Sequence, residues 1–218
     1  ALGCSHCGRP CPSNSSLPVG YRNMLEVQQL SIVQDGRQLW DSVSFQVRPG
    51  ERQGISAPSG YGKTTLGRVL AQWQSATSGR VMVGGKPLSQ KGYCPVQLVP
   101  QHPEQTFNPY RTTGESLRDA WSPDAVWLER LAVNPDWLTR RPDELSGGEL
   151  ARIALLRALD PRTRYLIADE VTAQLDAHVQ AQVWQVLLEE ARCRALGMIV
   201  FSHNKALLQK VCSSIWVP

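Results

Sequence analysis

The sequence lacks any run of about 18 or more apolar residues, so no segment of it is expected to cross a bilayer as a helix. It also lacks a large excess of one charge, because 23 Lys and Arg residues stand against 19 Asp and Glu residues, a net charge of +4. That imbalance is too small to indicate a nucleic-acid partner. Internal repeats are missing, and no basic region followed by an apolar stretch opens the chain, so no secretory signal is expected.

The composition is that of an ordinary soluble globular protein. With 218 residues, 42% of them apolar, the chain is long enough for one domain with a sizeable buried core. Residues 1–20 are rich in Cys, Pro, Ser and Gly and show no periodicity, which predicts a tail. The folded domain is therefore expected to span residues 21–218.

Three of the six cysteines, Cys4, Cys7 and Cys11, crowd this tail. Three thiolates with a fourth ligand would suit Zn²⁺ or an iron–sulfur cluster, although the spacing matches no standard zinc finger. Two interpretations stay open: a metal site, or a tail whose cysteines have no structural role. The other three cysteines are scattered in apolar surroundings, as reduced thiols of cytosolic proteins are.

The pattern of the chain predicts an α/β fold. Alternating apolar and polar residues over 25–30 and 42–47 predict a small antiparallel sheet near the N-terminus. Short apolar strands then alternate with helical segments, which implies right-handed crossovers and a mainly parallel sheet. The stretch from about 103 to 147 has helical patches but no clear strand, and it is expected to be an inserted helical subdomain.

A glycine-rich segment between an apolar strand and a helix predicts a phosphate-binding loop. Backbone N–H groups must wrap phosphate oxygens there, so side chains have to be small. Lys63 would reach the β- and γ-phosphates and the Thr64 hydroxyl would ligate Mg²⁺, whereas the alternative is a plain turn with a surface lysine. Ala57 stands where the pattern has Gly, and it is expected to stiffen the first turn. The predicted nucleotide-binding residues are Ser59, Gly60, Tyr61, Gly62, Lys63, Thr64 and Thr65.

Two carboxylates, Asp169 and Glu170, end the apolar strand 165–168. The C-terminal ends of parallel strands face the ligand crevice, so Asp169 is predicted to bind Mg²⁺ and Glu170 to polarise the attacking water as a general base. His203 follows the apolar strand 198–201 and is expected to point at the same crevice. Solvated acids at a strand end are the alternative, and the upstream phosphate loop favours the catalytic interpretation.

Ser146, Gly147 and Gly148 precede a helix predicted over 150–159. A hydroxyl and unobstructed N–H groups at a helix N-terminus make an anion site, although the same residues would serve as a plain helix cap. One triphosphate rarely needs two such helix starts. These residues are therefore predicted to face the nucleotide held by another copy.

Together these segments resemble the ABC ATPase family over about residues 24–217. Residues 59–65 resemble its Walker A loop, residues 145–149 its signature motif, and residues 166–170 its Walker B strand with the catalytic glutamate. Their order and spacing agree with those of the family. The resemblance implies a P-loop NTPase core, with the antiparallel β subdomain and helical subdomain described above.

The resemblance also implies roles for residues outside these segments. Gln101 is similar to the Q-loop glutamine, which touches Mg²⁺ and senses the membrane partner, and His203 to the switch histidine. Asp176 belongs to a segment similar to the D-loop, and it is expected at the nucleotide. The implied catalytic residues are Glu170, His203 and Gln101, and the implied Mg²⁺ ligands are Thr64, Gln101 and Asp169.

A finer resemblance lies in residues 99–110, where Gln101 is followed by an Asn-Pro pair as in ATPases of peptide and nickel importers. Gln34 departs from the family, which usually has at this place an aromatic residue that stacks on adenine. An adenine-stacking residue is therefore not identified at this place, and a nearby aromatic such as Trp40 is a candidate substitute. The chain also stops at Pro218, sooner than peptide-importer ATPases usually do.

The function implied is that of an ATP-binding and ATP-hydrolysing subunit, with Mg²⁺, that energises an importer for peptides or nickel and other metal complexes. The implied partners are a second ABC ATPase subunit, as a homo- or heterodimer, transmembrane permease subunits and, through the complex, a substrate-binding protein. The implied location is peripheral, on the cytoplasmic face of the inner membrane. Two alternatives stay open: a soluble non-transport ABC ATPase, and a degenerate ATP-binding regulatory domain.

Overall fold

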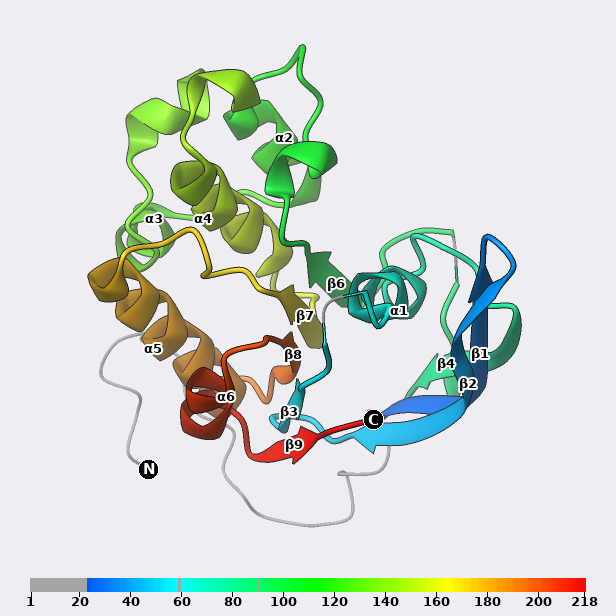
Figure 1. Cartoon of the computed structure of the whole chain (residues 1–218). Helices are drawn as coiled ribbons and strands as arrows, with labels where there is room; N and C mark the ends of the chain where they lie inside the picture. The colour runs from blue at the N-terminus through cyan, green and yellow to red at the C-terminus, as the bar shows by residue number, and fades with distance from the viewer. Residues whose placement is uncertain (1–22, 59, 90) are drawn as a thin grey trace.

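Strand pairing divides the chain into two sheets. The computed structural model describes residues 23–58, 60–89 and 91–218, so Ser59 and the cysteines of the tail lie outside the described residues. The first sheet is antiparallel with strand order β2-β1-β4-β5, and the second is parallel with order β6-β7-β8-β3-β9. This confirms the predicted α/β fold class, with an antiparallel sheet beside a mainly C-terminal parallel one (Figure 1).

The elements follow one another in a strand–helix rhythm. The antiparallel sheet consists of β1 (Leu25–Gln34), β2 (Arg37–Val47), β4 (Ser78–Val83) and β5 (Lys86–Pro87). The parallel sheet consists of β3 (Arg52–Ile55), β6 (Val96–Val99), β7 (Tyr165–Asp169), β8 (Gly197–Phe201) and β9 (Ser214–Trp216). The α-helices are α1 (Lys63–Leu70), α2 (Thr113–Ala120), α3 (Ala125–Arg130), α4 (Gly147–Ala158), α5 (Ala177–Cys193) and α6 (Lys205–Val211).

The segment between β6 and β7 contains helices and no strand among its described residues. Besides α2, α3 and α4, it holds three short 3₁₀ helices, each begun by a proline, at Pro103–Thr106, Pro135–Thr139 and Pro142–Glu144. Proline suits a helix start because its missing N–H would be unsatisfied there anyway. We propose that the stretch of about 103–147 is the helical subdomain that the sequence predicts.

Helix α4 begins three residues earlier than the sequence pattern predicted, at Gly147 instead of residue 150. Glycine is disfavoured in helix interiors, and Gly147 and Gly148 lie in the added turn. A capping box overrides this preference: the Ser146 hydroxyl accepts from the Glu149 N–H, and the Glu149 carboxylate accepts from the Ser146 N–H at 2.7 Å. The glycines therefore form the first turn of α4.

The two central strands of the parallel sheet, β7 and β8, are buried along their whole length because both faces of the sheet are covered. Leu166 and Ala168 point to one face and pack in a core shared with α4, α5 and α6. Tyr165 and Ile167, on the other face, pack in a core shared with α1 and the antiparallel sheet. Figure 1 shows α5 and α6 on one side of this sheet and α1 on the other.

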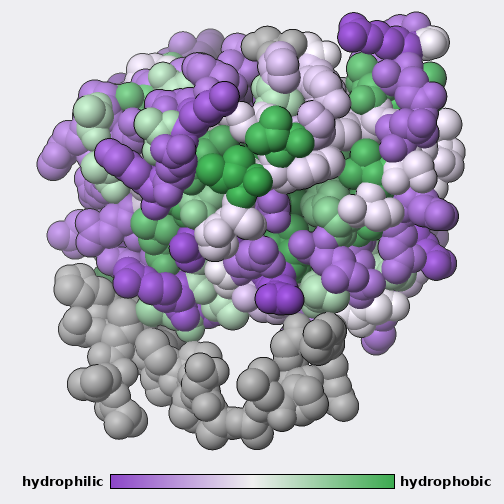
Figure 2. Space-filling view, turned by 60° about the horizontal axis from the view of Figure 1, so that its bottom comes forward, coloured by the Kyte–Doolittle hydropathy of each residue, from purple (hydrophilic) through white to green (hydrophobic). Residues whose placement is uncertain are grey.

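Figure 2 shows the underside of this arrangement, where hydrophobic side chains gather near the centre of a mainly hydrophilic face. Strand β9 lies at one edge of the parallel sheet, and Ile215 and Val217 of this last segment are exposed.

In the described part of the chain, no helix combines the length and the apolar character needed to cross a membrane.

The Tyr165 side chain joins the two sheets. Its buried hydroxyl accepts a hydrogen bond from the Leu25 N–H at 3.0 Å and lies 2.8 and 3.0 Å from the carbonyl oxygens of Asn23 and Val47. Burial raises the pKa of Tyr165 to about 12, so the hydroxyl keeps its proton and donates it to one of these carbonyls. These hydrogen bonds connect the start of β7 to the start of β1 and to the end of β2.

Replacing Tyr165 by Phe is expected to lower the free energy of unfolding by about 1–3 kcal/mol, because the buried Leu25 N–H then has no acceptor. The measurement is urea unfolding followed by tryptophan fluorescence. The matched control is Tyr110→Phe, since Tyr110 is 85% exposed and its hydroxyl lies in water. Equal stability of the two variants would show that the Tyr165 hydroxyl is not a stabilising bridge.

Candidate functional site

The C-terminal ends of three parallel strands, β3, β6 and β7, open into one cleft. The loop and α1 follow β3, Gln101 follows β6, and Asp169 and Glu170 end β7. The cleft has a volume of about 550 Å³, which is in the range of small-molecule sites, about 300–1,000 Å³. It is lined by Gln34, Asp35, Arg37, Leu39, Gly60, Gly62, Lys63, Thr64, Thr65, Gln101, Asp169 and Glu170.

The loop between β3 and α1 needs glycine at two positions. Gly60 and Gly62 have φ of +78° and +88°, in the left-handed region that favours residues without a side chain. A Cβ on Gly62 would also lie 3.1 Å from atoms of Leu39 and Trp40, whereas Gly60 faces open space. Ala57 has no positive φ, so its methyl group imposes no strain where the pattern has glycine. The loop therefore keeps its shape and leaves the Gly60 backbone open to the cleft.

Lys63, the first residue of α1, is buried under the loop that precedes it. Its ammonium group donates to the carbonyl oxygens of Ala57 and of Pro58, the latter at 3.0 Å. A buried ammonium needs such partners because it has lost its water. Lys63 also lines the cleft, so the loop holds a positive charge at the place predicted for phosphate binding.

The Thr64 hydroxyl donates a hydrogen bond of 2.6 Å to the Asp169 carboxylate. Asp169 is only 2% exposed, and burial raises its pKa despite this hydrogen bond, with the nearby Glu170 adding to the effect. Among the described residues no three His, Cys, Asp or Glu side chains gather as a metal site. A Mg²⁺ ion fits these oxygens, since it is usually bound by one or two carboxylates together with phosphates and water.

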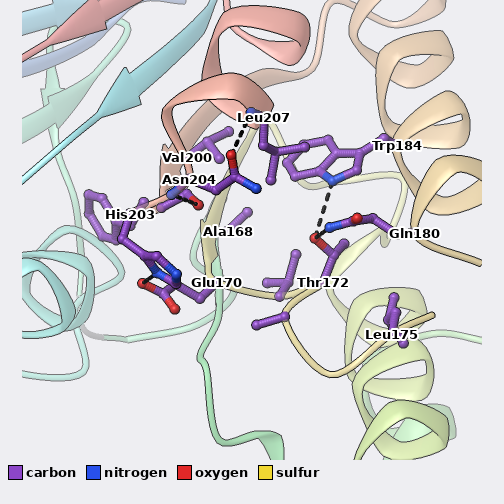
Figure 3. A pocket seen from close by; sticks show the side chains of 14 residues that line it. Ala168, Glu170, Thr172, Leu175, Gln180, Trp184, Val200, His203, Asn204 and Leu207 are labelled. Atoms are coloured by element: carbon purple, nitrogen blue, oxygen red, sulfur yellow. Dashed lines mark hydrogen bonds and ion pairs between the residues drawn. The ribbon is translucent and has the colours of Figure 1, made fainter. Parts of the chain in front are cut away.

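Glu170 is held by both its backbone and its side chain. Its φ of +50° is unusual for a residue with a side chain, and its N–H donates to the Phe201 carbonyl at 3.1 Å. The carboxylate lies 2.9 Å from Nδ1 of His203, which follows β8 (Figure 3). The Glu170 side chain is 13% exposed and that of His203 is 71% exposed. Glu170 lines the cleft, whereas His203 lines the smaller pocket next to it that Glu170 also borders. The pair therefore joins a largely buried carboxylate of the cleft to an accessible imidazole beside it, and strained residues such as Glu170 are often functional.

The segment after Glu170 is fixed by a second network. The buried Thr172 hydroxyl accepts hydrogen bonds from the Gln180 amide at 2.8 Å and the Trp184 indole at 3.2 Å, both on α5 (Figure 3). These residues line a smaller pocket of about 260 Å³ next to Glu170 and His203. Sequence patterns did not reveal this support, because it depends on how α5 packs against the end of β7.

The predicted signature residues Ser146, Gly147 and Gly148 do not line the cleft. They form an exposed turn at the start of α4, where Glu149 closes the capping box. The Ser146 N–H lowers the pKa of Glu149, so this carboxylate stays ionised. Asp176 is likewise outside the cleft lining and caps α5 by accepting from the N–H groups of His178 and Val179.

Trp40, the candidate substitute for the adenine-stacking aromatic, is not available to a base. Trp40 is 3% exposed, and its indole N–H donates to the Gly62 carbonyl at 3.0 Å. Its ring packs against Tyr61 and Trp216, with ring centroids 5.1 and 5.7 Å away. Burial of this large aromatic ring is favourable. Trp40 therefore supports the phosphate loop from the side of the antiparallel sheet. Gln34 does line the cleft and accepts from the Thr65 hydroxyl at 3.2 Å.

Sequence reasoning missed Asp35, Arg37 and Leu39, which line the cleft from the turn between β1 and β2. Asp35 and Gly36 are typical turn residues, but nothing in the local sequence indicates that this turn would face the phosphate loop. Strand pairing in the antiparallel sheet carries this turn there.

Comparison with known proteins identifies the family. The ABC transporter family matches residues 40–173. A putative oligopeptide transport ATP-binding protein of Bacillus subtilis (strain 168) is 31% identical over 89% of this chain and 67% of its own length. A putative peptide import ATP-binding protein of Brucella ovis is 30% identical over 81% of this chain and 62% of its own length. The chain thus spans about two thirds of the length of these relatives.

A solved structure has the same fold. The dimeric structure of a post-hydrolysis state of the ATP-binding cassette MJ0796, bound to ADP and phosphate, superposes with a TM-score of 0.76. It is 19% identical, and the match covers 88% of this chain and 93% of that one. The chain therefore belongs to the ABC transporter family, whose ATP-binding cassette fold it shares.

Proposed function

We propose that this chain binds and hydrolyses ATP with Mg²⁺ and thereby energises an ABC-type importer of peptides. The observation that carries the proposal is the single cleft that joins the Lys63 ammonium, the Thr64–Asp169 oxygen pair and the Glu170 carboxylate. Transfer of a phosphoryl group to water requires a cation for the phosphates, oxygen ligands for the metal and a general base for the water, and these three groups supply them.

Lys63 and the loop would bind the phosphates. The Lys63 ammonium would exchange the carbonyls of Ala57 and Pro58 for phosphate oxygens, which are stronger acceptors. Thr64 and Asp169 would hold Mg²⁺, which supplies charge neutralisation at the phosphate oxygens. The ionised form of the buried Asp169 would then be favoured by the cation beside it.

Glu170 would polarise the attacking water as a general base. Its positive φ and its contact with His203 fix the carboxylate at the cleft before any water is bound, so little rearrangement is needed. His203, with its exposed ring, would also reach the γ-phosphate, while Gln101 would contact the metal from the end of β6. These residues favour a working ATPase over a degenerate regulatory domain.

A second ABC ATPase subunit, either another copy or a homologous chain, would complete the site. Ser146, Gly147 and Gly148 stand apart from the cleft of their own chain and are exposed or half-buried, so they are free to cover a nucleotide held by the second subunit. Asp176 is exposed on the segment beside them and would lie at the same interface. The dimeric state named for the structural relative MJ0796 supports this arrangement.

The transmembrane permease would dock on a groove between the parallel sheet and the helical segment. The groove, of about 620 Å³, is lined by residues that follow α1 and by side chains of β6, α2 and α4, among them Trp73 and the ion pair of Arg111 with Asp119. The exposed Tyr110 belongs to the segment that follows Gln101. A displacement of Gln101 in the cleft would then be transmitted through this segment to the groove.

Peptides are the favoured cargo because the two relatives described above are named for oligopeptide and peptide import. A third, from Escherichia coli O6:H1, is named for glutathione import and is 28% identical over 81% of this chain and 32% of its own length. None of the three is named for nickel. We infer a peripheral location on the cytoplasmic face of the membrane and a substrate-binding protein that joins through the complex. These names favour transport over a soluble, non-transport role.

Replacing Lys63 by Ala is expected to weaken ATP binding at least tenfold, because a charge-assisted hydrogen bond to phosphate contributes about 1.5–3 kcal/mol. Titration with a fluorescent ATP analogue measures this. The control is Lys205→Ala, which removes an exposed lysine at the start of α6, outside the cleft. Equal affinity of the two variants would contradict the role of Lys63.

Replacing Glu170 by Gln is expected to lower the turnover number by a factor of about 10²–10⁴ while ATP binding persists, because only the general base is lost. ATP-dependent association of the variant, measured by size-exclusion chromatography, should then outlast that of the unchanged chain. Glu129→Gln, on the exposed side of α3, serves as the control with normal turnover. Normal hydrolysis by Glu170→Gln would show that Glu170 is not the base.

A further inference from the structure

The Gln174 side chain lies against the two glycines that begin α4. A Cβ added to Gly147 would come within 2.1 Å of Gln174 Oε1 and 3.0 Å of its Cδ. A Cβ added to Gly148 would lie 3.2 Å from the Gln174 carbonyl oxygen. The glycines thus leave the space in which the Gln174 amide rests, on the exposed turn that carries Ser146.

The residues on either side of Gln174 are fixed. Thr172 is held by the hydrogen bonds from α5, and Asp176 caps that helix. Within residues 23–58, 60–89 and 91–218, in contrast, no hydrogen bond engages the Gln174 amide, and the residue is exposed. A positioned amide with two N–H donors is therefore available beside the signature turn.

The turn itself has fewer free donors than its sequence implies. The Ser146 N–H is taken by the Glu149 carboxylate at 2.7 Å, and that carboxylate brings a negative charge close to the helix start. Both effects weaken the attraction of the turn for an anion. An additional neutral donor at this place would offset them.

We propose that Gln174 donates a hydrogen bond to the γ-phosphate of the ATP that the second subunit holds and that the signature turn of this chain covers. This inference rests on the proposed function, because it needs a nucleotide shared between two subunits. Gln174 is then a specificity-determining residue for ATP over ADP, since ADP has no γ-phosphate. Its position next to Gly147 and its unengaged amide are the two observations that carry the proposal.

The experiment compares Gln174→Ala, the isosteric Gln174→Glu and the control Gln185→Ala, which changes an exposed glutamine of α5 whose amide donates to Glu189. The full chain is used, and turnover is followed against ATP concentration. Gln174→Ala should raise the half-saturating ATP concentration about tenfold with the maximal rate within about twofold, because one hydrogen bond to a charged group is lost. Gln174→Glu should raise it further, because a carboxylate repels the phosphate.

ADP affinity, measured by calorimetry, should be the same in all three variants and in the unchanged chain. A half-saturating ATP concentration unchanged by both Gln174 substitutions would overturn the inference and leave the proposed function standing. A lowered one in Gln174→Ala would also overturn it, because the side chain would then obstruct the phosphate. If the unchanged chain binds ADP but neither hydrolyses ATP nor associates in its presence, the proposed function fails, and this inference fails with it.

Discussion

The hydrogen bond between Thr64 and Asp169 joins two segments 105 residues apart in the chain, and the candidate site depends on it. It ties the first turn of α1 to the end of β7. The bond is possible because β3 and β7 both pair with β8 in the parallel sheet, which brings their C-terminal ends to one edge. Once these ends meet, the loop cation and the acidic strand end face the same cleft.

The antiparallel sheet has a supporting role in this site. Trp40 of β2 holds the Gly62 carbonyl from behind, and Tyr165 ties the start of β7 to β1 and β2. Trp40, a candidate for stacking on adenine, is thus part of the scaffold, because burial of a large aromatic side chain is favourable. The phosphate loop keeps its shape through contacts made by residues distant in sequence.

The chain carries two segments proposed to bind phosphate, and they do not meet within it. The cleft at the end of the parallel sheet contains the residues proposed for hydrolysis, while the turn at the start of α4 lies outside the cleft lining. A capping box and the Gln174 side chain already satisfy or cover parts of this turn. The donors that remain on this turn could bind only a nucleotide held by another subunit. The proposed mechanism therefore includes a second subunit.

The sequence by itself determined the α/β class, and it predicted the site residues Lys63, Thr64, Asp169, Glu170 and His203. Each follows a strand or begins a helix, so local periodicity and glycine spacing reveal it. Only the tertiary structure decided that Trp40 is buried, that the turn near Asp35 lines the cleft, and that Gln174 rests on Gly147. These outcomes depend on packing between segments far apart in the chain, and local sequence patterns carry no information about such packing.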